Sequence, residues 1–280
     1  MSNDLTPSSG NVPAWMRSRS TGASIGNVDA SDLKPPRLKV LAGMSPEVME
    51  GVPNASPGNF WLTILNANLG KAVIGTPILL RKSYALWDPL EKRAPLASAT
   101  DGVNWDVPNQ KFEVRFPNNP RAVTWDTKRT VAESGLGQFG SSNPGDPKSK
   151  PAATLTYNTL WLIDIPNAPR QLCVMTVSRT GIAPMRTFIS TARAQGVDHY
   201  FQIYELIIVK KSGPTGDPYY LADYRYLRNI ESEKDGEFTE ALYKQYGTSG
   251  FVVDLHEEAE EKPAPQRYDS PKDDDQDIPF

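Results

Sequence analysis

The sequence predicts a mainly β fold: a small barrel of five strands, with one helix between strands 3 and 4, a long loop-rich insertion after strand 2, and disordered termini. Several runs rich in β-branched and aromatic residues are bounded by Gly, Pro, Asn or Asp, as strands are. A single apolar helical pattern separates two groups of such runs. The 25 Pro and 20 Gly residues are spread without a period, which indicates long loops.

The predicted strands begin in the first third of the chain. Residues 60–65 (FWLTIL) and 72–87 (AVIGTPILLRKSYALW) have strand composition. Pro77 predicts a bulge or an edge within the second run, because proline lacks the amide that a ladder needs. Later strands are predicted over residues 155–165, 171–179, 200–211 and 218–229.

One helix is predicted between these strands, over residues 182–195. Its apolar residues recur at helical spacing and are Ile182, Met185, Ile189 and Ala192. A terminal helix is predicted over residues 231–247. A helix between the third and fourth strands of a five-stranded antiparallel sheet is the order of the oligonucleotide/oligosaccharide-binding (OB) barrel. We therefore expect an OB-like barrel, with its binding face on strands 2 and 3 and on the loops that join strands 1–2 and 4–5.

The chain divides into three predicted parts. Residues 1–32 are rich in Ser, Gly, Asn and Asp without apolar periodicity, so we expect a disordered N-terminal arm. Residues 33–253 form the OB-like domain, with the insertion over residues 88–153. Residues 254–280 form a disordered acidic tail with ten acidic and three basic side chains, a charge of −7. Because the whole chain carries −3, the other residues carry +4, which suggests a basic body that meets a polyanion.

The sequence argues against an enzyme and against a metal or cofactor site. GLGQFG (135–140) matches G-x-G-x-x-G, but it neither follows a strand nor opens a helix, so we interpret it as a flexible loop. Two His and one Cys cannot supply a zinc site, and no nucleophile elbow or phosphate-binding loop is present. Cys173 lies in the apolar run LCVMTV, which predicts a buried, inert thiol. No run of about 18 apolar residues and no signal peptide is evident.

Basic and aromatic residues are interleaved in two segments, 78–130 and 170–228. Single-stranded nucleic acid requires this mixture, because cations follow the phosphates and aromatic rings stack on bases. Strand alternation also predicts that about half of these aromatics face a core. Trp87, Trp105 and Trp125 are favoured for binding because each lies in or beside a Pro, Asp or Gly-rich loop. The candidate residues are Arg81, Lys82, Tyr84, Trp87, Lys92, Arg93, Trp105, Lys111, Arg115, Trp125, Lys128, Arg129, Tyr204, Lys210, Lys211 and Tyr220.

The C-terminal DDDQDIPF combines a negative run with an apolar tip. It is similar to the acidic tip of bacterial single-stranded DNA-binding proteins, which recruits replication and repair enzymes. The resemblance covers eight residues, and Gln276 interrupts the acidic run. It implies that the tail binds protein partners through Asp273, Asp274, Asp275, Asp277, Ile278, Pro279 and Phe280.

A second resemblance covers residues 33–130. PPRLKVLAGMSPEV (35–48), LGKAVIGTPILLRKSYALWDP (69–89) and ATDGVNWD (99–106) resemble a family of bacteriophage-encoded single-stranded DNA-binding proteins. The resemblance implies a protein that coats single strands during phage replication and recombination, in the cytoplasm of the infected bacterium. The alternative is a viral structural or assembly protein whose acidic tail only solubilises it. A nuclease would require a carboxylate cluster in residues 33–253, which the sequence does not suggest.

Overall fold

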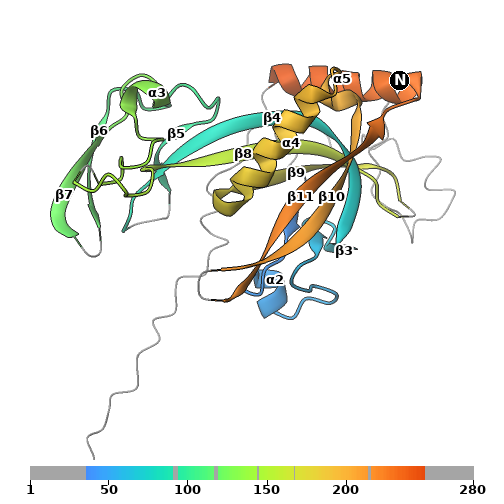
Figure 1. The fold of residues 1–280 in the computed structure, drawn as a ribbon, viewed down its shortest axis with the longest axis horizontal. Coiled ribbons are helices and arrows are strands. Elements are labelled where there is room, and N and C mark those ends of the chain that lie inside the picture. Colours follow the sequence, from blue (N-terminus) through green and yellow to red (C-terminus); the bar gives the residue numbers. More distant parts are fainter. Residues whose placement is uncertain are drawn as a thin grey trace, which may run out of the picture.

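The computed structural model describes residues 36–90, 94–116, 119–143, 145–166, 168–213 and 216–249. It is mainly β, with antiparallel sheets and few helices (Figure 1), as the sequence predicts. None of the helices in these ranges is long and apolar enough to span a membrane.

The main sheet has six strands, and β4 (Ala72–Trp87) lies at its centre. The 16 residues of β4 pair with β10 at their start, with β8 along most of their length, and with β5 at their end. The other strands, in the order of the sheet, are β11 (Pro218–Asn229), β10 (Gln202–Ser212), β8 (Ala153–Ile163) and β9 (Gln171–Ser178), with β5 (Pro95–Ala99) beside β4 only.

The predicted irregularity at Pro77 is confirmed. The register between β4 and β8 shifts between Pro77 and Leu79, so one residue of β4 has no direct partner. A bulge of this kind bends a strand and increases its twist. The bend lets the two ends of β4 belong to different parts of the sheet.

The inner face of the sheet is covered by α4 (Ile182–Ala194). Met185 and Phe188 of this helix are buried against Trp161 of β8 and Tyr204 of β10. The rings of Phe188 and Tyr204 meet edge to face at 4.9 Å, and Trp161 stacks on Tyr224 at 5.9 Å. Contacts of this geometry add to the free energy gained from burial alone.

The outer face of the sheet is covered by α5 (Glu233–Ser249). Leu242 of α5 is buried in a cluster with Ile78, Leu160 and Val174 of the sheet. Beside this contact, His199 Nε2 lies 3.1 Å from the carbonyl oxygen of Ile78, and burial lowers the pKa of the imidazole. Cys173 faces the inner core and is fully buried, which raises the pKa of its thiol.

The closed five-stranded barrel that the sequence predicts is not confirmed. Among the described strands, β9 and β11 form the two edges of the sheet and do not pair with each other. Near the β9 edge lies a small sheet of β1 (Leu38–Val40), β2 (Phe60–Leu62) and β3 (Ala67–Gly70), which α2 (Pro46–Met49) accompanies. The amide of Val174 donates to the carbonyl of Pro36 at 2.8 Å, which joins this sheet to β9.

The predicted loop-rich insertion is folded. It contains β5, the hairpin of β6 (Lys111–Phe116) and β7 (Asn119–Asp126), and the short helix α3 (Val131–Ser134). Trp105, Trp125 and Leu136 belong to its own hydrophobic core. Figure 1 shows it as a lobe at the far ends of β4 and β8. Its strands are short and separated by polar turns, so its composition alone predicts loops.

Replacing Trp125 with Ala should destabilise the insertion. The indole is 2% exposed and its Nε1 donates to the carbonyl of Ser142 at 3.3 Å. We expect the free energy of unfolding to fall by about 3–5 kcal/mol, measured by chemical denaturation. Phe139→Ala in the same lobe is the matched control, because that ring is 78% exposed and its removal should change stability by less than about 0.5 kcal/mol. Equal stability of the two variants would show that Trp125 is not a core residue.

Candidate nucleic-acid interface

Three predicted binding aromatics lie in cores. Trp105 and Trp125 are 3% and 2% exposed, and their indole N–H groups donate within the insertion, to the hydroxyl of Ser134 and the carbonyl of Ser142. Tyr204 is fully buried and donates to Gln202 at 2.6 Å, and burial raises its pKa to about 12. None of these rings presents a face on which a base could stack, so we exclude the three residues from the candidate interface.

Two predicted cations are engaged within the protein. Arg81 donates to the carbonyl of Gly247 at 3.1 Å, at the end of α5. Lys128 lies 2.7 Å from Asp126, and its hydrogen bonds are the main cause of the lowered pKa of that carboxyl group. One donor of the Arg81 guanidinium is therefore occupied, and the charge of Lys128 is partly neutralised by Asp126, before any ligand binds.

The other described candidates are spread over three places. Lys111, Arg115 and Arg129 are exposed on the insertion, and Trp87 is half-buried at the end of β4. Lys210 and Lys211 are exposed near the end of β10, where Lys210 pairs with Tyr220. The ring of Tyr220 packs on Gly58, which has no room for a Cβ atom. Lys92, Arg93 and the seven tail residues lie outside the described residues.

Lys82 and Tyr84 form the most suggestive pair. They are two residues apart on β4, so both side chains point to the same face of the sheet. The Lys82 ammonium lies 4.8 Å from the centre of the Tyr84 ring, a cation–π contact. Lys82 is exposed, Tyr84 is half-buried, and Leu155 of β8 lies opposite Tyr84. This is an exposed cation over an aromatic ring at the open end of the inner face.

The insertion fixes the position of this pair. A Cβ atom on Gly102 would lie 2.6 Å from the carbonyl oxygen of Lys82, and one on Gly137 would lie 3.1 Å from the Tyr84 ring. Two loops of the insertion therefore pack directly on β4. Pre-positioned side chains lose less entropy when a ligand binds.

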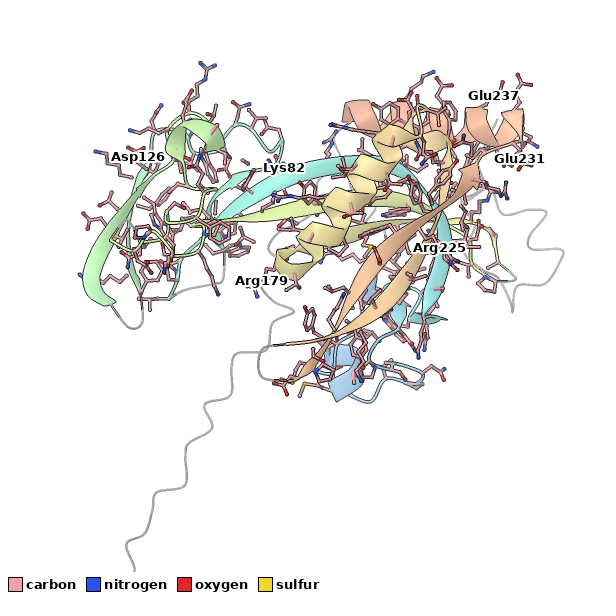
Figure 2. The ribbon with its side chains drawn as sticks, in the orientation of Figure 1. Lys82, Asp126, Arg179, Arg225, Glu231 and Glu237 are labelled. Atoms are coloured by element: carbon pink, nitrogen blue, oxygen red, sulfur yellow. The ribbon has the colours of Figure 1, made fainter. Side chains whose placement is uncertain are left out.

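Arg179 adds a second cation near the Lys82–Tyr84 pair. It follows Ser178, which pairs with Thr156 of β8, and Thr156 in turn pairs with Ser83 of β4. The side chain is exposed and its φ is +51°, an uncommon value outside glycine. Figure 2 shows Lys82 and Arg179 between the insertion and the β10–β11 hairpin. Both charges lie where the sheet leaves the cover of α4.

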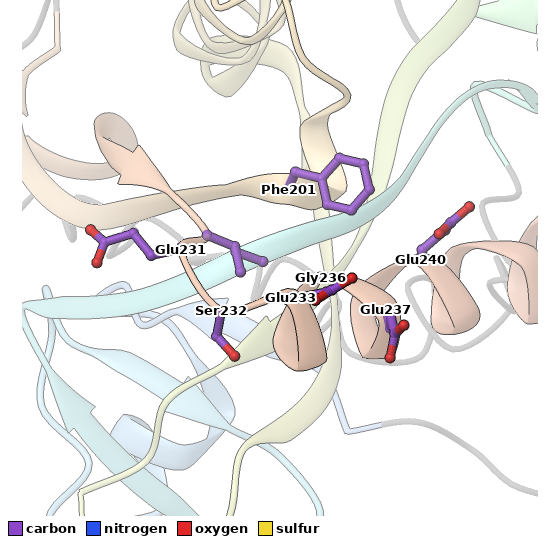
Figure 3. A pocket seen from close by; sticks show the side chains of 8 residues that line it. Phe201, Glu231, Ser232, Glu233, Gly236, Glu237 and Glu240 are labelled. Carbon is purple, nitrogen blue, oxygen red and sulfur yellow. The ribbon is translucent and has the colours of Figure 1, made fainter.

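A cavity elsewhere is unsuited to a polyanion. Its volume is about 340 Å³, and it lies where β11 runs into α5 (Figure 3). Phe201 and Ile230 line it together with four acidic side chains, Glu231, Glu233, Glu237 and Glu240. These carboxylates would repel phosphate. In the described part of the chain, no three His, Cys, Asp or Glu side chains are grouped to hold a metal ion.

Sequence reasoning missed four exposed residues: Phe139, Lys148 and Lys150 in the loop that follows Gly137, and Arg179 directly after β9. The GLGQFG spacing could have drawn attention to Phe139, since its glycines mark a loop with close backbone approaches. The basic DPKSKP run, which follows at residues 146–151, contains both lysines. Only the fold shows that their loop meets β4, at the contact of Gly137 with Tyr84.

Replacing Lys82 with Ala should weaken binding to single-stranded oligonucleotides. If the ammonium contacts one phosphate, the slope of log K against log salt should become less steep by about 0.7. Fluorescence anisotropy with labelled oligo(dT) over a salt series measures both quantities. Lys234→Ala is the matched control, because Lys234 is an exposed lysine on α5. An unchanged slope for the Lys82 variant would remove this residue from the interface.

Comparison with known proteins gives one family. Residues 6–250 match the sequence profile of the Pam3 phage gp34-like protein. No curated protein and no solved structure matches the chain significantly. The match covers most of the 280 residues. The chain therefore belongs to the Pam3 phage gp34-like family and is a phage protein.

Proposed function

We propose that this phage protein binds and coats single-stranded DNA during replication or recombination, without catalysing a reaction. The observation that carries the proposal is the strand order β11-β10-β4-β8-β9, with α4 between β9 and β10. Numbered along the chain, β4, β8, β9, β10 and β11 are strands 1 to 5 of an OB-like sheet, and α4 occupies the place of the OB helix. OB folds are themselves partly open barrels, so the unpaired edges of β9 and β11 are compatible with this assignment.

In the OB-like numbering, the insertion takes the place of a loop that binds the ligand in OB folds. The loop between strands 1 and 2 of an OB fold contacts the ligand, and here that connection is the whole insertion between β4 and β8. The insertion thus follows strand 1 and not strand 2 as the sequence predicts, because Phe60–Leu62 belongs to the separate small sheet. The outer face of strands 2 and 3 is the usual binding face, but α5 covers its apolar part. We therefore place the single strand at the junction of the insertion with β4, where Lys82, Tyr84 and Arg179 lie.

The chemistry at this junction suits a single strand better than a duplex. The Tyr84 ring and nearby cations match the stacking and phosphate contacts that unpaired bases allow. Among the described helices, α4 exposes two basic side chains, Arg186 and Arg193, which are fewer base-reading side chains than a typical major-groove helix presents.

The acidic tail is the proposed binding site for protein partners. By its similarity to the tip of bacterial single-stranded DNA-binding proteins, the segment 273–280 recruits replication, recombination or repair proteins. Phe280 would fill an apolar pocket on such a partner while the aspartates meet basic residues at its rim. These encounters would take place in the cytoplasm of the infected bacterium.

A structural or assembly role in the phage particle is the second candidate. Met44 and Met49, at the two ends of the α2 region, are 70% and 61% exposed. Exposed methionines are common at protein-binding surfaces. A protein of this class would assemble with itself or with particle proteins and would bind oligonucleotides only weakly.

We expect single-stranded DNA to bind far more tightly than duplex of the same length. Lys82, Lys148, Lys150 and Arg179 are the exposed cations that we assign to the bound single strand. If each neutralises one phosphate, the slope of log K against log salt should be about −3. Mobility shifts with both DNA forms over a salt series measure affinity and slope. Equal affinity for duplex would contradict the proposal.

Deleting residues 273–280 should maintain or raise affinity for single strands. The tethered negative charges compete with DNA for the basic surface at high effective concentration. Raising salt should reduce the difference between the full-length and truncated proteins, because exposed charge pairs are screened. Phe280→Ala should leave DNA affinity unchanged and lose host partners in pull-down experiments. If truncation abolished DNA binding, the recruiting role of the tail would be wrong.

A further inference from the structure

Phe139 has the most exposed large apolar side chain in the described part of the chain, at 78%. Single exposed apolar residues are common on protein surfaces and need no explanation by themselves. The surroundings of Phe139 distinguish it, because its loop is ordered by hydrogen bonds, packs on Tyr84 and carries two lysines.

Hydrogen bonds on both sides hold the loop around Phe139. The amide of Gly140 donates to the carbonyl of Ser149 at 2.7 Å, and the amide of Ser142 donates to that of Lys150 at 3.1 Å. The hydroxyl of Ser141 lies within hydrogen-bond distance of the carbonyls of Leu136 and Gln138, at 2.9 and 2.6 Å, and accepts from the amide of Ala152. The ring of Phe139 is therefore presented to solvent by a fixed backbone.

The glycines of GLGQFG explain the path of this loop. Gly135 ends α3 with φ of +66°, a left-handed cap. Gly137 crosses the Tyr84 ring at a distance that leaves little room for a side chain. Gly140 has φ of +88° and lies close to the backbone of Pro147. The GLGQFG glycines therefore let the loop pack against β4 and expose Phe139, and they do not form a dinucleotide-binding site.

Two cations lie on the opposite arm of the same loop. The side chains of Lys148 and Lys150 are exposed. They flank Ser149, whose carbonyl accepts from Gly140, the residue after Phe139. An aromatic ring with lysines on the neighbouring arm has the elements of a stacking site for one unpaired base and its flanking phosphates.

We propose that Phe139 stacks on a base of the bound single strand, while Lys148 and Lys150 contact the adjacent phosphates. The inference rests on the proposed single-stranded DNA binding and extends it to a specific loop. Because Gly137 joins this loop to Tyr84, the bound DNA strand runs from the Lys82–Tyr84 pair onto the loop that carries Phe139. A protein partner is the other ligand that an exposed Phe could serve, and the experiment separates the two.

The test compares four variants for binding to fluorescein-labelled oligo(dT): Phe139→Ala, Phe139→Leu, Phe139→Trp and Val103→Ala. Both Ala and Leu at position 139 should lower affinity by roughly 5- to 150-fold, the equivalent of about 1–3 kcal/mol of stacking. Trp should retain or raise affinity because it keeps an aromatic face. Val103 is 55% exposed in the same lobe and has no ring, so its variant should bind like the wild type.

Salt dependence tests the two kinds of contact separately. Removing the ring should leave the slope of log K against log salt unchanged, whereas the double variant Lys148→Ala/Lys150→Ala should make it less steep by about 1.4. Melting temperatures of all variants identify any loss that comes from unfolding.

If the wild type does not bind oligo(dT), the proposed function fails. If the wild type binds and Phe139→Ala binds as well as Val103→Ala, the stacking site at Phe139 is wrong. Full affinity of Phe139→Leu would indicate an apolar contact without stacking, of the kind a protein partner makes, and would also overturn the inference.

Discussion

The pairing of β4 is the constraint on which the rest of the structure depends. This one strand pairs with β10 at its start, with β8 along most of its length and with β5 at its end, and the bulge at Pro77 bends it within the β8 pairing. The first half of β4 lies in the body of the protein, between α4 on the inner face and α5 on the outer face. The second half, together with β8, carries the insertion. Without this continuous strand the insertion would have no fixed position relative to the body.

The candidate interface follows from the same strand. Lys82 and Tyr84 lie beyond the part of β4 that the helices cover and before the part that enters the insertion core. Close packing of Gly102 and Gly137 on this segment leaves the insertion little freedom to shift there. The aromatic residues divide accordingly: Trp105, Trp125 and Tyr204 stabilise cores, whereas Tyr84 and Phe139 retain exposed surface near cations. A DNA strand bound here would contact both the sheet and the loop that carries Phe139.

Long, regular elements could be predicted from the sequence. β4 and β11 have the predicted bounds, and α4 differs from its prediction by one residue, because each has a sustained composition or period and clear ends. The fold of the insertion could not be predicted, since β5, β6 and β7 are short and their core residues are far apart in sequence. For the same reason, loop-like surroundings suggested that Trp105 and Trp125 were exposed. Phe139 was missed because its exposure depends on Gly137 packing on a strand about fifty residues earlier in the chain.

The most direct test of single-strand binding at the junction is ultraviolet cross-linking of the full-length protein to oligo(dT), with the attached peptides identified by mass spectrometry. We expect the nucleotide on peptides that contain Tyr84 or Phe139. Duplex of the same length should give far less of the same adducts. Adducts confined to peptides from α5 or from the acidic cavity beside Phe201, or equal yields with single strands and duplex, would contradict the account.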